Sequence, residues 1–318
     1  MTIKRFWLIS PVNWIDSSEP GMYICIDLGG SNIRGTWMDR DGRCGEVLNV
    51  PRPRELAGTK KALAGLIQNV MQKSPGAVNN IGIASAGPLN LEQGIYFTPT
   101  NMPELKGFDL AGFVSGIFGI RPVLENDAQA AALGEIFNGC LAGEKDALVF
   151  TLGTGLGSGV IMDRRVWRGR LDAGPELGHV YMGPNRGKRC GCGQTGCAET
   201  WLNAAALKEL AMQNGLSLAS LKDLDIYLEK KDEKALVTMQ QYGRRLGLFL
   251  SQMVSIFGIK NIGLSGGLSR LGPCFSEVVP QSINFRLKTR PWLIPDRIEL
   301  SPDPQMSALW GMGYLMQQ

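Results

Sequence analysis

Apolar residues occur along this chain in short runs that end at glycines or polar residues, a pattern typical of buried strands in α/β proteins. One run at 23–27 leads through a glycine turn at 28–30 into a second apolar run, which predicts a β-hairpin. Residues 147–162 repeat this arrangement around a turn at 153–155. Because one such unit opens each half of the chain, we expect two related domains that hold a polyphosphate between them. On the first hairpin alone, a phosphate loop and an ordinary Gly-Gly turn are equally good interpretations.

Helical spacing of apolar residues predicts an amphipathic helix at 58–73 and a mostly helical region at 204–257. A closing helix is predicted at 304–317, where Ala308, Gly311 and Gly313 would let it pack closely against a sheet. No flexible linker interrupts the chain, so we expect the domains to be joined by helices and crossovers.

Three polar residues stand where a predicted strand gives way to a predicted helix. The short apolar run at 123–124 is followed by Glu125, Asn126 and Asp127, and an alanine-rich helix begins there. In α/β sheets this is the usual position of ligand-binding groups. An Asp at a helix start is most often an N-cap, and a general base is the sharper alternative. Asn101 lies in a loop rich in turn residues, where an amide is either a turn residue or a ligand contact.

The chain's single histidine lies close to three of its seven cysteines. His179, Cys190, Cys192 and Cys197 make a four-ligand set of the kind that zinc binds, and four protein ligands indicate a closed, structural site. The alternatives are a chance cluster of core cysteines and a redox pair, although Cys-Gly-Cys is not the usual redox spacing.

Two carboxylates flank this cysteine cluster. Glu176 precedes the histidine by three residues, and Glu199 follows the last cysteine by two. Each could be a solvated surface carboxylate. A metal that fixes the loop would instead let both accept hydrogen bonds from a polyol, so a sugar-like ligand is the preferred interpretation.

Composition limits the function classes. The chain has 318 residues, 44% hydrophobic and 19% charged, which is typical of a globular enzyme. A net charge of +4 argues against a nucleic-acid surface, and the arginines at 164, 165, 168 and 170 are typical of a solvated hairpin. No apolar run is long enough to span a membrane. The scattered remaining cysteines favour a reducing compartment, so a cytoplasmic protein is expected.

These motifs together resemble the ROK family (repressors, open reading frames, kinases) of bacterial sugar kinases, from about Met22 to the C-terminus. The resemblance is carried by the following segments: Asp27-Leu-Gly-Gly-Ser-Asn, Glu125-Asn-Asp, Leu152-Gly-Thr-Gly-Leu-Gly-Ser-Gly, Glu176-Leu-Gly-His, Cys190-Gly-Cys-Gly-Gln-Thr-Gly-Cys-Ala-Glu and Ser265-Gly-Gly. The family implies an actin-like ATPase fold with two ribonuclease H-like α/β domains and a cleft between them. It also implies a homodimer.

The resemblance assigns a role to each matching residue. Asp127 resembles the general base that takes the proton from the sugar hydroxyl as it attacks the γ-phosphate of ATP. The residues that resemble the sugar-binding set are Asn101, Asn126, Glu176, His179 and Glu199. The groups that resemble the nucleotide site are Asp27, the phosphate loops Gly29, Gly30, Ser31, Gly153, Thr154 and Gly155, and the adenosine wall Gly266 and Gly267. Magnesium would arrive with ATP, and His179 would bind zinc through one ring nitrogen and the sugar through the other.

The resemblance also implies a division of the chain. Residues 1–21 would form an N-terminal extension, 22–127 with 302–318 a small α/β domain, and 128–301 a large α/β domain with the zinc loop. The sequence departs from the family at four positions. Ser31 replaces the usual Thr, Asp172 and Pro175 stand at usual glycines, and Leu105 stands where many members have Trp. Asp172 and Pro175 lie near the predicted sugar carboxylate and bear on sugar specificity.

The function expected from these observations is ATP-dependent phosphorylation of a hydroxyl on a hexose or N-acetylhexosamine. The alternative is a sugar-responsive transcriptional regulator, because family repressors share the zinc and sugar motifs. Repressors carry an N-terminal helix-turn-helix, and the residues before the first predicted strand show no helical pattern. The kinase is therefore the preferred interpretation, and the identity of the sugar is open.

Overall fold

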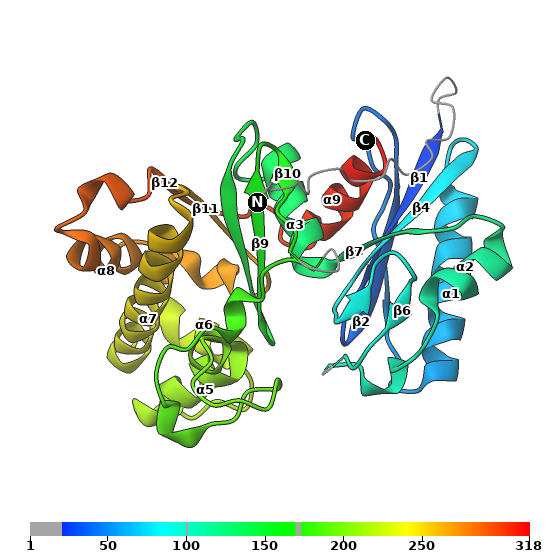
Figure 1. The fold of residues 1–318 in the computed structure, drawn as a ribbon. Helices are drawn as coiled ribbons and strands as arrows, with labels where there is room; N and C mark the ends of the chain where they lie inside the picture. The colour runs from blue at the N-terminus through cyan, green and yellow to red at the C-terminus, as the bar shows by residue number, and fades with distance from the viewer. Residues whose placement is uncertain (1–20, 100, 170–172) are drawn as a thin grey trace, which may run out of the picture.

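The computed structural model describes residues 21–99, 101–169 and 173–318. Two five-stranded sheets organise the protein, and they are connected in the same way (Figure 1). In the first sheet the order is β3-β2-β1-β4-β7, and in the second it is β10-β9-β8-β11-β12. Each begins with an antiparallel hairpin whose first strand then pairs in parallel with later strands. The duplication expected from the two strand–glycine–strand units is thus confirmed at the level of the sheets.

The strands of the first sheet are β1 (Met22–Leu28), β2 (Asn32–Met38), β3 (Leu48–Pro51), β4 (Val78–Ser85) and β7 (Val123–Asn126). Those of the second are β8 (Ala147–Leu152), β9 (Leu156–Met162), β10 (Arg165–Val166), β11 (Asn261–Ser265) and β12 (Arg297–Leu300). A small antiparallel pair, β5 (Leu89–Asn90) and β6 (Ile95–Tyr96), lies outside both sheets. The central strands β1, β4, β8 and β11 are apolar and largely buried, as expected of strands covered on both faces.

Helices cover these sheets. They are α1 (Leu56–Lys73), α2 (Leu110–Phe118), α3 (Asp127–Phe137), α4 (Glu199–Leu202), α5 (Ala204–Gln213), α6 (Lys222–Glu229), α7 (Glu233–Phe257), α8 (Val278–Leu287) and α9 (Ser307–Leu315). Single 3-10 turns are η1 (Pro103–Leu105), η3 (Leu177–His179), η4 (Asn185–Gly187), η5 (Ser269–Cys274) and η6 (Pro291–Leu293). The predicted helices at 58–73 and 204–257 are present as α1 and as α5 to α7. None of the helices in the described ranges has the length and apolar character that a bilayer crossing requires.

Helices α3 and α9 lie side by side between the two sheets (Figure 1). They approach so closely because glycines stand at the crossing: a Cβ on Gly311 would lie 1.8 Å from the carbonyl oxygen of Ala130, and one on Gly134 1.9 Å from that of Ser307. The sequence predicted that the glycines of α9 would let this helix pack closely against a sheet. That prediction is wrong for Gly311, which packs on α3, and right for Gly313, which faces Met38 of β2.

The packing of these two helices is relevant to the predicted division of the chain. Helix α9 contacts β1 and β4 of the first sheet, although it is the last element in sequence. Helix α3 contacts β8 and β9 of the second sheet. Both contacts agree with a small domain of 22–127 plus 302–318 and a large domain of 128–301, whose boundaries stay a prediction. The predicted extension falls, apart from Gly21, outside the described residues.

Candidate active site

Asp127 is the first residue of α3, directly after β7 ends at Asn126. The N-cap of this helix is Asn126, whose Oδ1 accepts hydrogen bonds from the N–H groups of Ala128 (3.0 Å) and Gln129 (3.3 Å). The capping interpretation therefore applies to Asn126 rather than to Asp127. The Oδ1 of Asp127 accepts one bond from the Ala128 N–H at 2.9 Å, and its Oδ2 has no hydrogen-bond partner among the described residues. The Oδ2 atom is therefore free to accept a proton from a ligand.

The environment of Asp127 favours its protonated form. Burial raises the pKa of Asp127 to about 6, with smaller contributions from the negative charges of Asp27 and Glu176. The hydrogen bond from the Ala128 N–H acts in the opposite direction. A carboxylate with a pKa close to neutral pH is well suited to accept a proton in a reaction and release it afterwards.

Asp27 lies near the end of β1, two strands from β7, the strand that leads into Asp127. Parallel pairing sets Asp27 beside Ala84 of β4, and Ala84 beside Glu125 of β7, so these strand ends share one edge. Burial raises the pKa of Asp27, while Arg34 on β2 lowers it through an ion pair of 3.3 Å. The Nε of Arg34 is buried and has no partner in the described part of the chain. A phosphate oxygen would satisfy such a donor.

The first glycine turn is held by a residue that sequence reasoning missed. Arg52 donates from Nε and Nη2 to the carbonyl of Gly30, at 3.1 and 2.8 Å, and its own N–H donates to the carbonyl of Ser31. Its nearly buried guanidinium also forms an ion pair with Glu104, close to the loop that carries Asn101. Arg52 therefore links the predicted phosphate turn to the predicted sugar loop.

Asn101 itself approaches the same turn. A Cβ built on Gly30 would lie 3.9 Å from the Cβ of Asn101. The side chain of Asn101 is exposed and makes no hydrogen bond to any other described residue. Its amide is thus available to a ligand near the first glycine turn.

The second glycine turn and the glycines after β11 contact each other. Gly266 has a φ of +84°, and a Cβ there would lie 2.6 Å from the carbonyl oxygen of Leu152, directly before Gly153. The N–H of Leu268 donates to the same carbonyl at 2.9 Å. The segments 153–155 and 266–267, which the family resemblance assigns to the nucleotide, therefore lie next to each other. A side chain at Gly266 would both clash and strain the backbone.

The predicted metal ligands lie together. The nitrogen of His179 and the sulfurs of Cys190, Cys192 and Cys197 all lie within 4.8 Å of one another. The Nδ1 of His179 is 3.5 Å from the Cys190 Sγ, and the Cys192 and Cys197 sulfurs are 3.6 Å apart. Three thiols and one imidazole nitrogen at this spacing fit the tetrahedral, soft-ligand site that zinc prefers.

The flanking carboxylates are placed by the same loop. Glu176 Oε2 lies 3.9 Å from the Nε2 of His179, the ring nitrogen that faces away from the cysteines. Glu199 accepts a hydrogen bond from the N–H of Leu156 at 3.1 Å, and its other oxygen lies 3.2 Å from the Cys190 Sγ. Glu199 thus joins the second glycine turn to the metal cluster. A Cβ on Gly155 would lie 2.7 Å from Oε2 of this carboxylate, so a side chain there would displace Glu199.

Glu125 and Arg168 form a pair that the sequence did not predict. Glu125 is fully buried beside Asn126, and Arg168 binds both of its oxygens, with 3.2 Å between Nη1 and Oε1. The expectation that the arginines near 168 form a solvated hairpin is therefore wrong for Arg168. Bidentate pairing offsets the cost of burying the Glu125 charge. It also ties the strand before Asp127 to the segment after β10.

Three of the departures from the family pattern can be described in structural terms. The carbonyl of Pro175 accepts a hydrogen bond from the Ser158 hydroxyl at 2.7 Å, which fixes the chain just before Glu176. Leu105 is fully buried in the core of the first domain, and Ser31 is exposed at the first turn. Asp172 lies outside the described residues.

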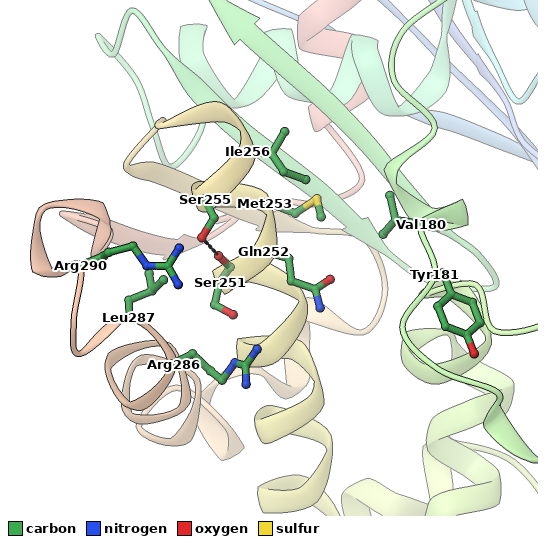
Figure 2. Close-up of a pocket in the computed structure, with 10 residues that line it drawn as sticks. All are labelled: Val180, Tyr181, Ser251, Gln252, Met253, Ser255, Ile256, Arg286, Leu287 and Arg290. Atoms are coloured by element: carbon green, nitrogen blue, oxygen red, sulfur yellow. Dashed lines mark hydrogen bonds between the residues drawn. The ribbon is translucent and has the colours of Figure 1, made fainter.

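A cavity lies elsewhere, between α7, α8 and residues 180–181. It has a volume of about 440 Å³ and is lined by Arg286 and Arg290 on one side and Tyr181 on the other (Figure 2). Among the described residues, its lining contains no carboxylate and none of the predicted site residues. This cavity is therefore separate from the strand edge that leads to Asp127.

A profile of the ROK family matches residues 23–318, nearly the whole chain. The chain belongs to the ROK family. The glucokinase of Thermotoga maritima is 30% identical over 265 residues, covering 78% of this chain and 83% of that protein. The glucokinase of Streptomyces coelicolor is 28% identical over 280 residues, covering 82% and 87%. The xylose repressor of Bacillus subtilis is 27% identical over 291 residues, covering 87% and 72%.

Solved ROK structures have the same fold. A ROK family glucokinase from Streptomyces griseus, in complex with glucose and AMPPNP, superposes with a TM-score of 0.80 at 26% identity, covering 93% of this chain and 99% of that one. The ROK hexokinase from Thermus thermophilus gives 0.78 at 29% identity, covering 92% and 98%. These matches confirm the actin-like ATPase fold expected from the sequence.

Proposed function

We propose that this ROK protein transfers the γ-phosphoryl group of ATP to a hydroxyl of a hexose or N-acetylhexosamine. The observation that carries the proposal is Asp127, a carboxylate with a pKa raised to about 6 and a free Oδ2, at a shared strand edge with Asp27. The relatives named glucokinase and the glucose–AMPPNP complex of a similar structure support it. Which sugar is used is left to experiment.

In the proposed reaction the carboxylate of Asp127 takes the proton of the sugar hydroxyl. The hydroxyl oxygen forms a bond to the γ-phosphorus while the bond from that phosphorus to the β–γ bridging oxygen breaks. The products are ADP and a sugar phosphate, and the proton on Asp127 then leaves to solvent. Positioning by the surrounding groups accounts for most of the rate in such a reaction.

The sugar would be held by groups with unused hydrogen-bonding capacity. The Oδ1 of Asn126 caps α3, so its NH₂ group is left to donate to a hydroxyl. Glu176 is largely exposed and offers two acceptors, and the Nε2 of His179 faces it. We also assign Asn101, near the first glycine turn, and Glu199, beside the second, to the residues that bind the sugar.

The nucleotide would lie against the two glycine turns. Backbone N–H groups at 29–31 and 153–155 can approach phosphate oxygens closely because glycines leave room for them. Arg34 supplies a buried donor next to Asp27. Magnesium bound to ATP would supply charge neutralisation. The adenosine is assigned to the surface formed by Gly266 and Gly267.

Zinc is assigned to His179, Cys190, Cys192 and Cys197. With four protein ligands a bound zinc would supply structural rigidity. The loop would then hold the His179 ring, with Glu176 and Glu199 on either side, in fixed orientations for binding the sugar. A homodimer and a cytoplasmic location stay predictions, and light scattering on the purified protein tests the first.

A second candidate function is a sugar-responsive regulator, which the similarity to the xylose repressor favours. Such a protein needs the sugar groups but no proton acceptor and no turns for phosphates. The raised pKa of Asp127 and the adjacent glycine segments at 153–155 and 266–267 support the kinase instead.

A coupled assay of ADP release over a panel of hexoses and N-acetylhexosamines tests this function. We expect one or a few sugars to raise ADP release at least a hundredfold above the rate with no sugar. Sugar binding by calorimetry without any sugar-dependent ADP release would instead support the regulator.

The dependence of kcat/KM on pH provides a second test. The base must be ionised, and the pKa of Asp127 is raised to about 6. Activity should therefore be constant above pH 7 and fall about tenfold per pH unit below 6. A profile that stays flat down to pH 4.5 would contradict the assignment of the base.

A further inference from the structure

A smaller cavity, of about 170 Å³, lies behind the metal loop, between η4, α4, α5 and α7. Like the cavity of Figure 2, it brings cationic, aromatic and amide groups together, but in a smaller and less open space. Its lining includes Asn185, Arg186, Trp201, Glu209, Gln213 and Arg245. None of these has a role in the proposed kinase site.

The cavity has an excess of positive charge that Glu209 in its lining neutralises only in part. Neither Arg186 nor Arg245 makes an ion pair or a hydrogen bond to another described residue through its guanidinium. Arg245 is half-buried, and burial lowers its pKa; the nearby charge of Glu209 acts in the opposite direction, and that of Arg186 lowers the pKa further. The carboxylate of Glu209 is engaged by Lys188 at 2.8 Å and by Gln213 at 3.2 Å. The single negative charge of Glu209 is thus shared among Lys188, Arg186 and Arg245, and the net positive charge that remains can attract an anion.

A neutral donor also lacks a partner there. The indole Nε1 of Trp201 is buried and has no hydrogen-bond acceptor among the described residues. Arg245 stacks on the same ring, with 5.1 Å between its guanidinium carbon and the ring centroid. Leaving a buried donor unsatisfied is costly, so a ligand oxygen that accepts from it would gain binding free energy.

The loop beside the cavity is held in an unusual conformation. Asn185 and Arg186 have φ angles of +39° and +54°, in the left-handed region that non-glycine residues rarely adopt. Asn185 is fixed there because its Nδ2 donates to the carbonyl and the hydroxyl of Thr200, at 2.6 and 3.0 Å. Strain of this kind is often retained where it serves a binding site.

We propose that this cavity is an anion-binding site for a phosphate group, held by Arg186, Arg245 and the indole N–H of Trp201. The volume is below the usual range for nucleotides and drug-sized ligands, which points to one phosphate group rather than to ATP. Guanidinium groups bind phosphate oxygens through charge-assisted hydrogen bonds. The phosphate belongs either to inorganic phosphate or to a sugar phosphate that extends into solvent.

The site is connected to the sugar-binding residues through a short path. Thr200, which Asn185 holds, directly follows Glu199 in the first turn of α4. An anion that fixes η4 would therefore bias the position of Glu199, and sugar binding would in turn affect the anion. This consequence rests on the proposed kinase function, in which the product is itself a sugar phosphate. The anion site does not depend on it.

The test is a calorimetric titration of the full-length, zinc-loaded protein with inorganic phosphate, in the presence of AMPPNP and magnesium to occupy the glycine turns. Arg245→Gln removes one cation, and Trp201→Phe removes the indole donor but keeps an aromatic ring. Arg286→Gln is the matched control, because Arg286 lines the larger cavity of Figure 2. Circular dichroism and thermal unfolding check that each variant is folded.

We expect one phosphate per chain, with affinity at least tenfold weaker in Arg245→Gln, a few-fold weaker in Trp201→Phe and unchanged in Arg286→Gln. Tighter binding of glucose 6-phosphate with the same dependence on Arg245 would identify a sugar phosphate as the ligand, and equal affinity would identify the phosphate group alone. Equal phosphate affinity in wild type and Arg245→Gln, or no binding in wild type, would overturn the proposal. Failure of the kinase function would appear separately, as absent sugar-dependent ADP release.

Discussion

Replacing Asp127 with asparagine should make the protein more stable while it removes activity. The pKa of Asp127 rises from 3.8 to about 6 on folding, so the folded state binds this proton more tightly than the unfolded state. The sign follows from that difference. Below pH 3.8 the carboxyl is protonated in both states and does not destabilise the folded protein. As the pH rises through 6 the free energy of unfolding decreases, because the folded protein disfavours the ionised form.

The magnitude can be worked out from the same shift. At about 1.4 kcal/mol per pKa unit, the ionised carboxylate costs roughly 3 kcal/mol at pH 8 and about half of that at pH 5. The asparagine side chain of the variant carries no charge at either pH, and the Asn126 cap of α3 is unaffected by the substitution. The variant should therefore gain up to these amounts over wild type, with the larger gain at pH 8.

Urea unfolding of both proteins at pH 5 and pH 8, without nucleotide, measures these differences. Asp109→Asn is the matched control, because Asp109 caps the start of α2 by accepting from the Gly112 N–H and asparagine caps equally well. The control should change stability by less than about 0.5 kcal/mol. If Asp127→Asn were less stable than wild type at pH 8, or gained the same stability at both pH values, the ionised Asp127 would not be what destabilises the folded protein.

Three further substitutions test other parts of the account. Arg52→Met should destabilise the protein by about 3 kcal/mol and raise the KM for ATP, because Glu104 and the Gly30 carbonyl lose a buried partner. The control Arg43→Met, at an exposed arginine, should change neither stability nor the KM for ATP. Cys192→Ala should reduce zinc from one equivalent per chain to near zero by metal analysis, whereas Cys274→Ala should retain it, and wild type without zinc would contradict the site. Gly311→Ala should cost about 2 kcal/mol or more in urea unfolding through its clash with Ala130, whereas Gly116→Ala, with open space around it, should cost nothing.

Local sequence patterns predicted the elements well. The two glycine hairpins are β1–β2 and β8–β9, and their sheets have the same strand order, as the repeated pattern suggested. The clustering of His179 with three cysteines was also predictable, because the four ligands lie within nineteen residues and a short loop must bring them together. In each case the interacting residues are close in sequence.

The features that the sequence did not predict depend on contacts between distant segments. Arg52 looks like an ordinary loop residue between two prolines, since its partner Glu104 is 52 positions away. Arg168 looked like part of a solvated patch because Glu125, which it pairs with, is 43 positions away. Gly311 was expected on a sheet, and only the fold shows that α3 lies there instead. Pairing over such distances leaves no periodic signal in the chain.

The most direct test of the central claim compares sugar binding and turnover in wild type and Asp127→Asn, with the sugar that the panel identifies. We expect the calorimetric affinity for the sugar to change less than threefold, because Asn126, Glu176 and His179 are intact, while kcat falls by at least a thousandfold. Turnover within tenfold of wild type would contradict the claim that Asp127 is the base.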